Sequence, residues 1–411
     1  MPVGVVECAR LKSRVASKYL TGNDYRLKQR WCKEKTRVAE GSSLMKVSCS
    51  HTSIFALDIL AAPMPSLKRQ LARKTRKFRQ RYMPPKEVVI RLKAGTHAWS
   101  MMKPVYDRTS RIAPGEHLLM TMGRDENLRI PHFLDHYRSL GIDHFLFVDN
   151  LSTAPMADML AAEDDCSLWW TNQPYENARW GVDWMNALLP RFAKGHWCLT
   201  VDLDEYFVFP HIESRSLREL THHLDDIGKP SLYSLLIDMY PEGPIDDALL
   251  HPGQDPLEIA PLFDGSGYHA QKSNNGTILV RGGPRLRSIN DGALEGAPAI
   301  NKIPLVKWNH GYSYNLSTHE LYPTNLNHAH HQGIHTPTGA LLHFKFLSTF
   351  REKVSQAIEE GNHYNNSSEY QQYQKHIDAV ECFRLDSEVS TSYTGSASLL
   401  DHNLITSGHW A

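Results

Sequence analysis

The sequence predicts an α/β fold with a mostly parallel sheet flanked by helices, preceded by a basic N-terminal extension. Three observations predict it. Short apolar runs alternate with helical periodicity from residue 116 to residue 201, acidic residues follow two of these runs, and the charge changes sign near residue 115. Strands that alternate with helices at short spacing are typical of βαβ units, which build parallel sheets covered by helices.

The alternation contains four predicted strands, at residues 118–122, 144–148, 166–170 and 197–201. Apolar residues recur at helical spacing between these strands, which predicts helices at residues 126–140, 154–162 and 179–192. Gly141 fits the end of the first helix. Further along, we expect a helix at 217–227, a strand at 234–239 and long loops over 241–300, where Gly, Pro, Asp and Asn are frequent.

The composition is that of a globular protein, with 411 residues of which 41% are hydrophobic and 22% charged. Residues 1–111 contain 25 Lys and Arg against 7 Asp and Glu, a net charge of +18. Because the whole chain sums to +0, residues 112–411 carry a net charge of −18. An acidic body argues against a nucleic-acid partner and suits a cleft where carboxylates bind a divalent cation.

These patterns divide the chain into three parts. They are a basic extension at 1–115, an α/β domain at 116–350, and a C-terminal helix with a polar tail at 351–411. Residues 66–82 form a cationic segment, either a solvated helix or disordered arm, or a contact for anionic lipid headgroups. We found no apolar stretch of about 20 residues and no signal-peptide layout.

The six cysteines form no CxxC pair, which suggests reduced thiols. Together with the absence of an apolar span, this predicts a cytoplasmic protein, with peripheral contact at the inner face of the membrane through the basic arm.

Two acidic clusters follow predicted strands. Asp149 ends the second strand, and Asp202, Asp204 and Glu205 come directly after the fourth. In open α/β sheets, ligands bind beyond the carboxyl ends of the strands. Carboxylates two residues apart at such an end can share one Mg²⁺ or Mn²⁺ ion, which prefers oxygen ligands and often keeps substrate phosphates in its shell.

The chain resembles the GT-A glycosyltransferases, in particular the family-2-like group with a D-x-D-E-[FY] motif. That motif reads Asp202-Leu203-Asp204-Glu205-Tyr206 here, and matching segments extend over roughly residues 117–350. The resemblance implies a GT-A-type, Rossmann-like fold and an enzyme that transfers a sugar from a nucleotide-sugar donor. It also implies a Mn²⁺ or Mg²⁺ ion at the DxD motif.

The resemblance implies roles for individual residues. Asp202 and Asp204 would bind the ribose and the metal, which makes Asp204 part of the catalytic machinery, and Glu205 would orient them. Contacts to the nucleotide-sugar are expected from Arg124, Glu126, Asp149 and Arg179. The family usually has Asn-Glu where this chain has Asp125-Glu126, a departure that puts this contact in question. Asp149 also fits a turn, and Arg179 also fits a surface position.

Six histidines lie between residues 319 and 343. Neutral imidazole is a good ligand for divalent metals, and GT-A enzymes often complete the metal shell with a C-terminal histidine. His319 and His343 are the predicted ligands, whereas His328, His330 and His331 could instead bind adventitious metal. Arginine and lysine match phosphate oxygens, so Arg285 and Lys345 are predicted to clamp the diphosphate, with Arg281 and Arg287 as further candidates.

An inverting transfer needs a carboxylate that accepts the proton of the acceptor hydroxyl. Asp238, at the end of a predicted strand, is our candidate base, and Glu242, Asp264 and Asp291 are alternatives. The predicted partners are a nucleotide-sugar donor and a glycan or lipid-linked acceptor, by family analogy a surface polysaccharide. Two other functions stay open at this point, a metal-dependent hydrolase of nucleotide-sugars and a non-catalytic glycan-binding protein.

Overall fold

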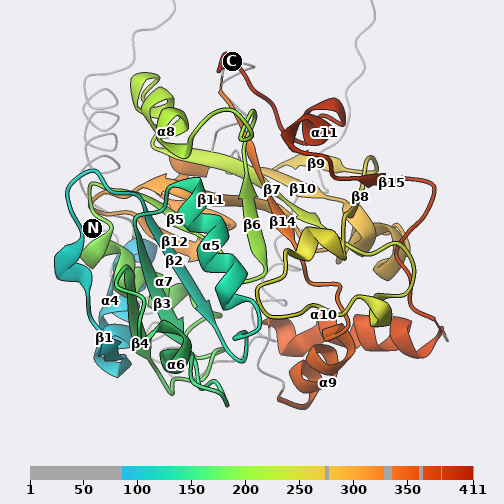
Figure 1. The fold of residues 1–411 in the computed structure, drawn as a ribbon, viewed down its shortest axis with the longest axis horizontal. Coiled ribbons are helices and arrows are strands. Elements are labelled where there is room, and N and C mark those ends of the chain that lie inside the picture. The colour runs from blue at the N-terminus through green and yellow to red at the C-terminus, as the bar shows by residue number, and fades with distance from the viewer. Residues whose placement is uncertain (1–85, 274–276, 328–335, 361–363, 381, 411) are drawn as a thin grey trace, which may run out of the picture. The chain divides into compact units, whose positions relative to one another are not determined.

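The computed structural model describes residues 86–273, 277–327, 336–360, 364–380 and 382–410 (Figure 1). The cationic segment at 66–82 and the histidines His328, His330, His331 and His335 lie outside this part of the chain. Within it, the protein is an α/β structure in which helices flank a large mixed sheet. None of the described helices is long and apolar enough to cross a membrane.

The central sheet has nine strands in the order β1-β4-β3-β2-β5-β11-β7-β14-β6. In that order they span Lys103–Tyr106, Cys166–Trp170, His144–Asp149, Leu118–Gly123, Trp197–Thr200, Asn301–Lys307, Ser231–Asp238, Gly339–His343 and Glu205–Val208. Strands β2, β3, β4, β5, β7 and β14 run in one direction, while β1, β11 and β6 run against them. The carboxyl ends of the six co-directional strands therefore meet at one edge.

Helices cover both faces of the sheet. The longer ones are α4 (Lys86–Met101), α5 (Ile130–Leu140), α7 (Val182–Phe192), α8 (Leu217–Asp226), α9 (Phe350–Glu360) and α10 (Tyr364–Asp378), and the shorter ones are α6 (Met156–Leu160) and α11 (Ser396–Asp401). The β2–α5–β3 crossover moves along the sheet in one direction and the β4–α7–β5 crossover in the other. Because such crossovers are right-handed, α5 and α7 lie on opposite faces.

The first half of the domain follows its predicted elements closely. The four predicted strands form β2 to β5, and α5 ends at Gly141, whose φ of 99° is the left-handed conformation that glycine adopts without strain. The predicted helix at 217–227 and strand at 234–239 correspond to α8 and β7, but the rest of the second half differs from its prediction. Strand β11 enters the sheet antiparallel, and the expected loop over 241–300 contains β8 (Leu262–Asp264), β9 (His269–Lys272) and β10 (Ile278–Arg281).

The described parts of both predicted flanking regions pack on the domain. Strand β1 pairs with β4, and α4 packs against α7, so the expected boundary at residue 115 falls inside the packed fold. At the other end, Leu399 and Trp410 belong to the main core. Helices α9 and α10 lie side by side (Figure 1) and share a separate small core, whose members include Phe350, Val354 and Tyr373.

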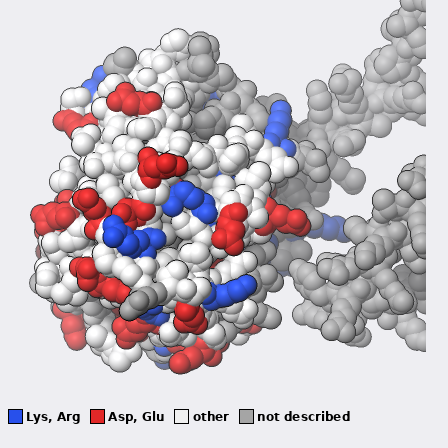
Figure 2. Space-filling view, turned by 90° about the vertical axis from the view of Figure 1, so that its right-hand side faces the viewer, with Lys and Arg blue, Asp and Glu red and all other residues white. Residues whose placement is uncertain are grey.

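Charged side chains of both signs are mixed on the face shown in Figure 2, where basic residues lie among acidic ones. A nucleic-acid backbone is bound by a continuous basic surface. This face of the described part carries no such surface.

Candidate functional site

The sheet brings several of the predicted residues to one edge. Strands β2, β3, β5, β7 and β14 end there at Gly123, Asp149, Thr200, Asp238 and His343. The chain order also reverses at this edge, because β3 lies on one side of β2 and β5 lies on the other. Such a switch point, at the carboxyl ends of parallel strands, is where open α/β sheets bind their ligands.

The DxD segment forms a tight turn between β5 and β6. The backbone N–H of Glu205 donates to the carbonyl of Asp202 over 3.1 Å, and the backbone N–H of Asp202 donates to the Glu205 carboxylate over 3.2 Å. The turn lies close to the end of β2, since a Cβ at Gly123 would lie 2.7 Å from Leu203 Cδ1. Glycine at position 123 therefore allows the acidic turn to reach the edge.

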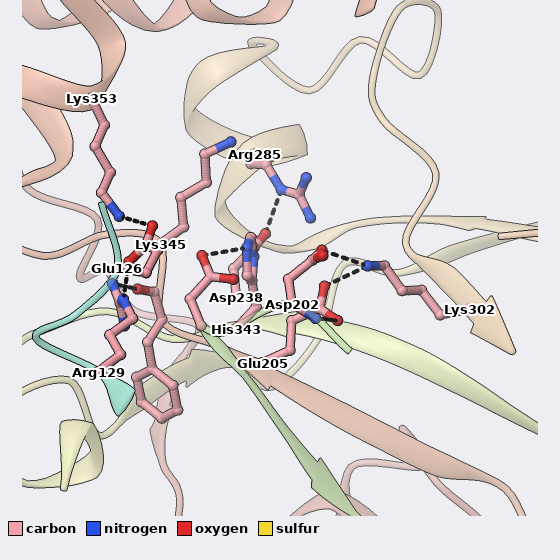
Figure 3. Close-up of polar contacts among 12 residues, drawn as sticks. Glu126, Arg129, Asp202, Glu205, Asp238, Arg285, Lys302, His343, Lys345 and Lys353 are labelled. Atoms are coloured by element: carbon pink, nitrogen blue, oxygen red, sulfur yellow. Dashed lines mark hydrogen bonds and ion pairs between the residues drawn. The ribbon is translucent and has the colours of Figure 1, made fainter. Parts of the chain in front are cut away.

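Asp204, His343, Asp238 and Arg285 form a chain of polar contacts, of which Figure 3 shows the part from His343 through Asp238 to Arg285. His343 Nε2 lies 3.4 Å from Asp204 Oδ2, and His343 Nδ1 lies 2.7 Å from Asp238 Oδ1. The other oxygen of Asp238 accepts from Arg285 Nε over 2.7 Å. Strands β14 and β7 place Asp238 beside His343 in parallel register, which fixes the central link. The imidazole is thus oriented with Nε2 towards Asp204.

The charges in this chain stabilise one another. Burial by itself lowers the pKa of His343, but Asp204 and Asp238 outweigh it and raise that pKa to about 9. Burial likewise favours neutral carboxyls, yet the pKa of Asp204 lies well below its ordinary value because of His343. The pKa of Asp238 is lowered too, against burial, by Arg285 and His343. Both carboxylates are therefore ionised at neutral pH.

Lys302 is a central residue of the site that the sequence analysis missed. Its side chain, 4% exposed, forms a short ion pair with Glu205 and lies 3.5 Å from Asp202 (Figure 3). Burial raises the pKa of Glu205 to about 7. Burial by itself lowers the pKa of Lys302, but the neighbouring Glu205 and Asp202 outweigh it and raise that pKa above its ordinary value. The signal in the sequence was a lysine within the apolar strand Asn301–Lys307.

The loop after β2 is tied to α9 across the mouth of the site. Glu126 pairs with Arg129 over 3.0 Å and forms a short ion pair with Lys353 of α9. Arg124 pairs with Glu360 of the same helix over 2.9 Å. The predicted donor contacts Arg124 and Glu126 therefore lie where the sheet edge and the C-terminal helices face each other.

These groups surround a cavity of about 1000 Å³. Eight of the eleven predicted site residues line it, namely Arg124, Glu126, Asp202, Asp204, Arg285, His319, His343 and Lys345. Its wall also includes Asn150, Tyr175 and Trp184, whose two aromatic rings lie 5.9 Å apart. The cavity combines carboxylates, buried cations and aromatic rings, a lining that suits a polar, charged ligand with a planar ring.

The structure does not bring the four predicted metal ligands together. The described residues contain no group of three or more His, Cys, Asp and Glu side chains placed to hold a metal, so the predicted set of Asp202, Asp204, His319 and His343 does not come together. His319 Nδ1 instead lies 2.6 Å from the carbonyl of Asn301, and Asp202 lies beside Lys302.

Asp204 and His343 do fit a cation that a bound phosphate helps to hold. A metal-binding histidine commonly bonds a carboxylate through its other nitrogen, as His343 does with Asp238. Mg²⁺ commonly takes one or two protein carboxylates and completes its shell with water and substrate phosphates.

Asp149, Arg179 and Asp238 do not line the cavity. The carboxylate of Asp149 accepts the backbone N–H groups of Ser152 and Met156, so it stabilises the turn before α6 and does not contact a donor. Arg179 pairs with Asp183 of α7. Asp238 is 2% exposed and both of its oxygens are engaged, so it orients His343 and cannot reach an acceptor hydroxyl as the predicted base would.

The remaining candidates also have other roles. Arg281 donates to the carbonyl of Ala297, and Arg287 pairs with Asp264, so neither clamps a ligand in this cavity. Glu242 and Asp291 are exposed and do not line the cavity.

No protein-family model matches this chain, and no curated protein matches it either.

Proposed function

We propose that the protein is a glycosyltransferase that moves a sugar from a nucleotide-sugar donor to a glycan or lipid-linked acceptor, with Mn²⁺ or Mg²⁺ at Asp204 and His343. The observation that carries the proposal is the Asp204–His343–Asp238 arrangement inside the large cavity. Its place at the carboxyl ends of the parallel strands supports a nucleotide ligand. The D-x-D-E-[FY] resemblance supports sugar transfer.

Each residue would have a distinct task. When bound, the divalent cation would neutralise the charge that develops on the diphosphate leaving group. Asp204 and His343 hold the cation, and Asp238 keeps the imidazole in the orientation that presents Nε2. Lys302 holds Glu205 and so fixes the turn that carries Asp204. Tyr175 and Asn150 lie in the same cavity, where a nucleobase can stack and form hydrogen bonds.

A thermal-shift panel tests the proposal. The protein is melted with UDP, GDP, CMP or dTDP, each with and without Mn²⁺, because a ligand that binds the native state raises the melting temperature. We expect one nucleotide to raise it, and Mn²⁺ to enlarge that rise. Asp204→Ala should lose the Mn²⁺-dependent part of the shift and sugar transfer while it keeps a cooperative unfolding transition. An Asp204→Ala variant that still transfers sugar would refute the metal role.

A labelled nucleotide-sugar separates the transferase from the two alternatives. Release of free sugar at a rate that acceptors do not stimulate would favour a hydrolase. Failure of every nucleotide to bind would favour a glycan-binding protein. Peripheral membrane contact through the basic arm is a separate part of the proposal. It would be refuted if deleting residues 1–85, which leaves α4 in place, did not reduce co-sedimentation of the protein with anionic liposomes.

A further inference from the structure

One corner of the cavity holds a buried arginine and a partly buried lysine that share a single carboxylate. Arg285 is 6% exposed, and the Lys345 side chain is 16% exposed. Both face Glu369 of α10, whose Oε1 lies 3.6 Å from Arg285 Nη1 and 3.8 Å from Lys345 Nζ. All three residues line the cavity.

Glu369 satisfies these cations incompletely. Charge-assisted hydrogen bonds between nitrogen and oxygen are about 2.7–2.9 Å long, so both of its contacts are longer than direct bonds. Arg285 Nη2 is buried and has no hydrogen-bond partner in the described part of the chain. Because buried polar groups are nearly always paired, an acceptor with more oxygens than a carboxylate would satisfy these cations more fully.

Arg285 and Lys345 are held in place independently of Glu369. Arg285 Nε donates to Asp238, which leaves the other side of the guanidinium for a ligand (Figure 3). Lys345 Nζ lies 4.7 Å from the ring centres of both Tyr370 and Tyr373, contacts that attract a cation. The two cations would therefore keep their positions if the carboxylate left.

We propose that Arg285 and Lys345 form a binding site for a phosphate or diphosphate group, and that Glu369 occupies this site as an internal substitute for the ligand until the ligand displaces it. A diphosphate brings more charge and more oxygens than one carboxylate, and arginine binds phosphate through two parallel hydrogen bonds. Glu369 is 36% exposed, so its side chain can turn into solvent. The hydroxyl of Tyr373 donates to it and holds it in the site.

The identity of the natural ligand as the donor's diphosphate rests on the proposed function. The anion site itself does not, because inorganic pyrophosphate is a sufficient probe. Calorimetric titration of the full chain with pyrophosphate, without metal, should give binding that Glu369→Gln tightens about tenfold, the gain expected if the open arrangement is populated about a tenth of the time. Lys345→Met should weaken binding by a similar factor, because it removes one of the two cations.

Two further variants keep the test decisive. Tyr373→Phe retains the buried ring and removes the hydroxyl that holds Glu369, so it should also tighten binding, by less than Glu369→Gln. Glu359→Gln is the matched control, since Glu359 is an exposed acid of α9 that lines the same cavity. It should change the affinity far less than Glu369→Gln.

If Glu369→Gln does not change the affinity for pyrophosphate, or changes it no more than Glu359→Gln does, Glu369 is not an internal substitute for the ligand. Binding that Lys345→Met leaves intact overturns the site. Parallel titrations with inorganic phosphate and with UDP identify the source of the ligand. Tight pyrophosphate binding combined with no nucleotide binding would refute the proposed donor and leave the anion site standing.

Discussion

Asp238 illustrates how a residue's neighbours decide its chemistry. The sequence predicted a general base at the end of a strand, and the end of the strand is where Asp238 lies. Parallel pairing with β14 then places His343 directly beside it, and Arg285 takes its second oxygen. The carboxylate of Asp238 orients the imidazole of His343, so Asp238 is a positioning residue in the proposed mechanism.

We expect Asp238→Asn to weaken Mn²⁺ binding on the order of tenfold, because the partner of a metal-binding histidine controls its basicity and orientation. Electron paramagnetic resonance of free Mn²⁺ measures this directly. Asp246→Asn is the control, since Asp246 pairs with Arg351 at the surface. Equal Mn²⁺ affinity in both variants would contradict the role of Asp238.

Lys302 and Glu205 are a buried pair whose halves depend on each other, with side chains 4% and 1% exposed. Removing one partner of such a pair leaves an uncompensated buried charge, so Lys302→Met should lower the free energy of unfolding by about 3–5 kcal/mol. The double variant Lys302→Met/Glu205→Gln should recover much of that loss. Urea denaturation measures both.

An exposed pair provides the comparison for Lys302. Lys307 pairs with Asp225, and its side chain is 41% exposed. Exposed pairs contribute up to about 1 kcal/mol, so Lys307→Met should cost far less than Lys302→Met. Equal losses of stability in the two variants would show that the buried Lys302–Glu205 pair contributes no more than an exposed pair.

At the scale of elements, α4 depends on a close approach to α7. A Cβ at Gly95 would lie 2.5 Å from the carbonyl oxygen of Asn186, a backbone atom of α7 that cannot move aside cheaply. Alanine gains about 0.8–1 kcal/mol over glycine in a helix, whereas overpacking costs about 1–3 kcal/mol. The two effects oppose each other, and the backbone contact favours a net loss.

Gly95→Ala is therefore expected to destabilise the protein, as measured by urea unfolding. Lys93→Ala, an exposed change on the same helix, should stay within about 0.5 kcal/mol of the natural sequence. A stabilised Gly95→Ala variant would show that α4 does not pack on α7 in solution.

At the scale of the whole molecule, buried histidines couple stability to pH. Burial, with Arg218 adding to it, lowers the pKa of His117 from 6.5 to about 4, and burial with His132 does the same for His136. As pH falls below 6.5, the unfolded chain takes up these protons before the folded chain does. Their contribution to stability is therefore complete above pH 6.5 and is lost as pH falls towards 4.

Unfolding midpoints at pH 7, 6 and 5 should decline along this range. The double variant His117→Gln/His136→Gln should decline less steeply, because glutamine does not titrate. An identical slope in both proteins would show that other groups control stability in this range.

The first half of the domain could be predicted from the sequence. The spacing of apolar residues and the length of the apolar runs predicted β2 to β5. The acidic turn was predicted because Asp202 and Asp204 come directly after an apolar strand. These features depend on residues close together in the chain, where hydrophobic spacing, turn chemistry and strand length act locally. The family resemblance and the chemistry of imidazole and guanidinium groups placed His343 and Arg285 among the predicted site residues, but they could not say which groups these residues touch.

The pairing of those groups depends on how the whole chain folds. Strands β7, β11 and β14 come from distant parts of the chain, and their order in the sheet brings Asp238 and His343 together and places Lys302 beside the acidic turn. The contact of Glu369 with Arg285 depends on how α10 packs. Such contacts are fixed by the burial of side chains across the whole fold, because hydrophobic packing is non-directional and no local pattern encodes its partners.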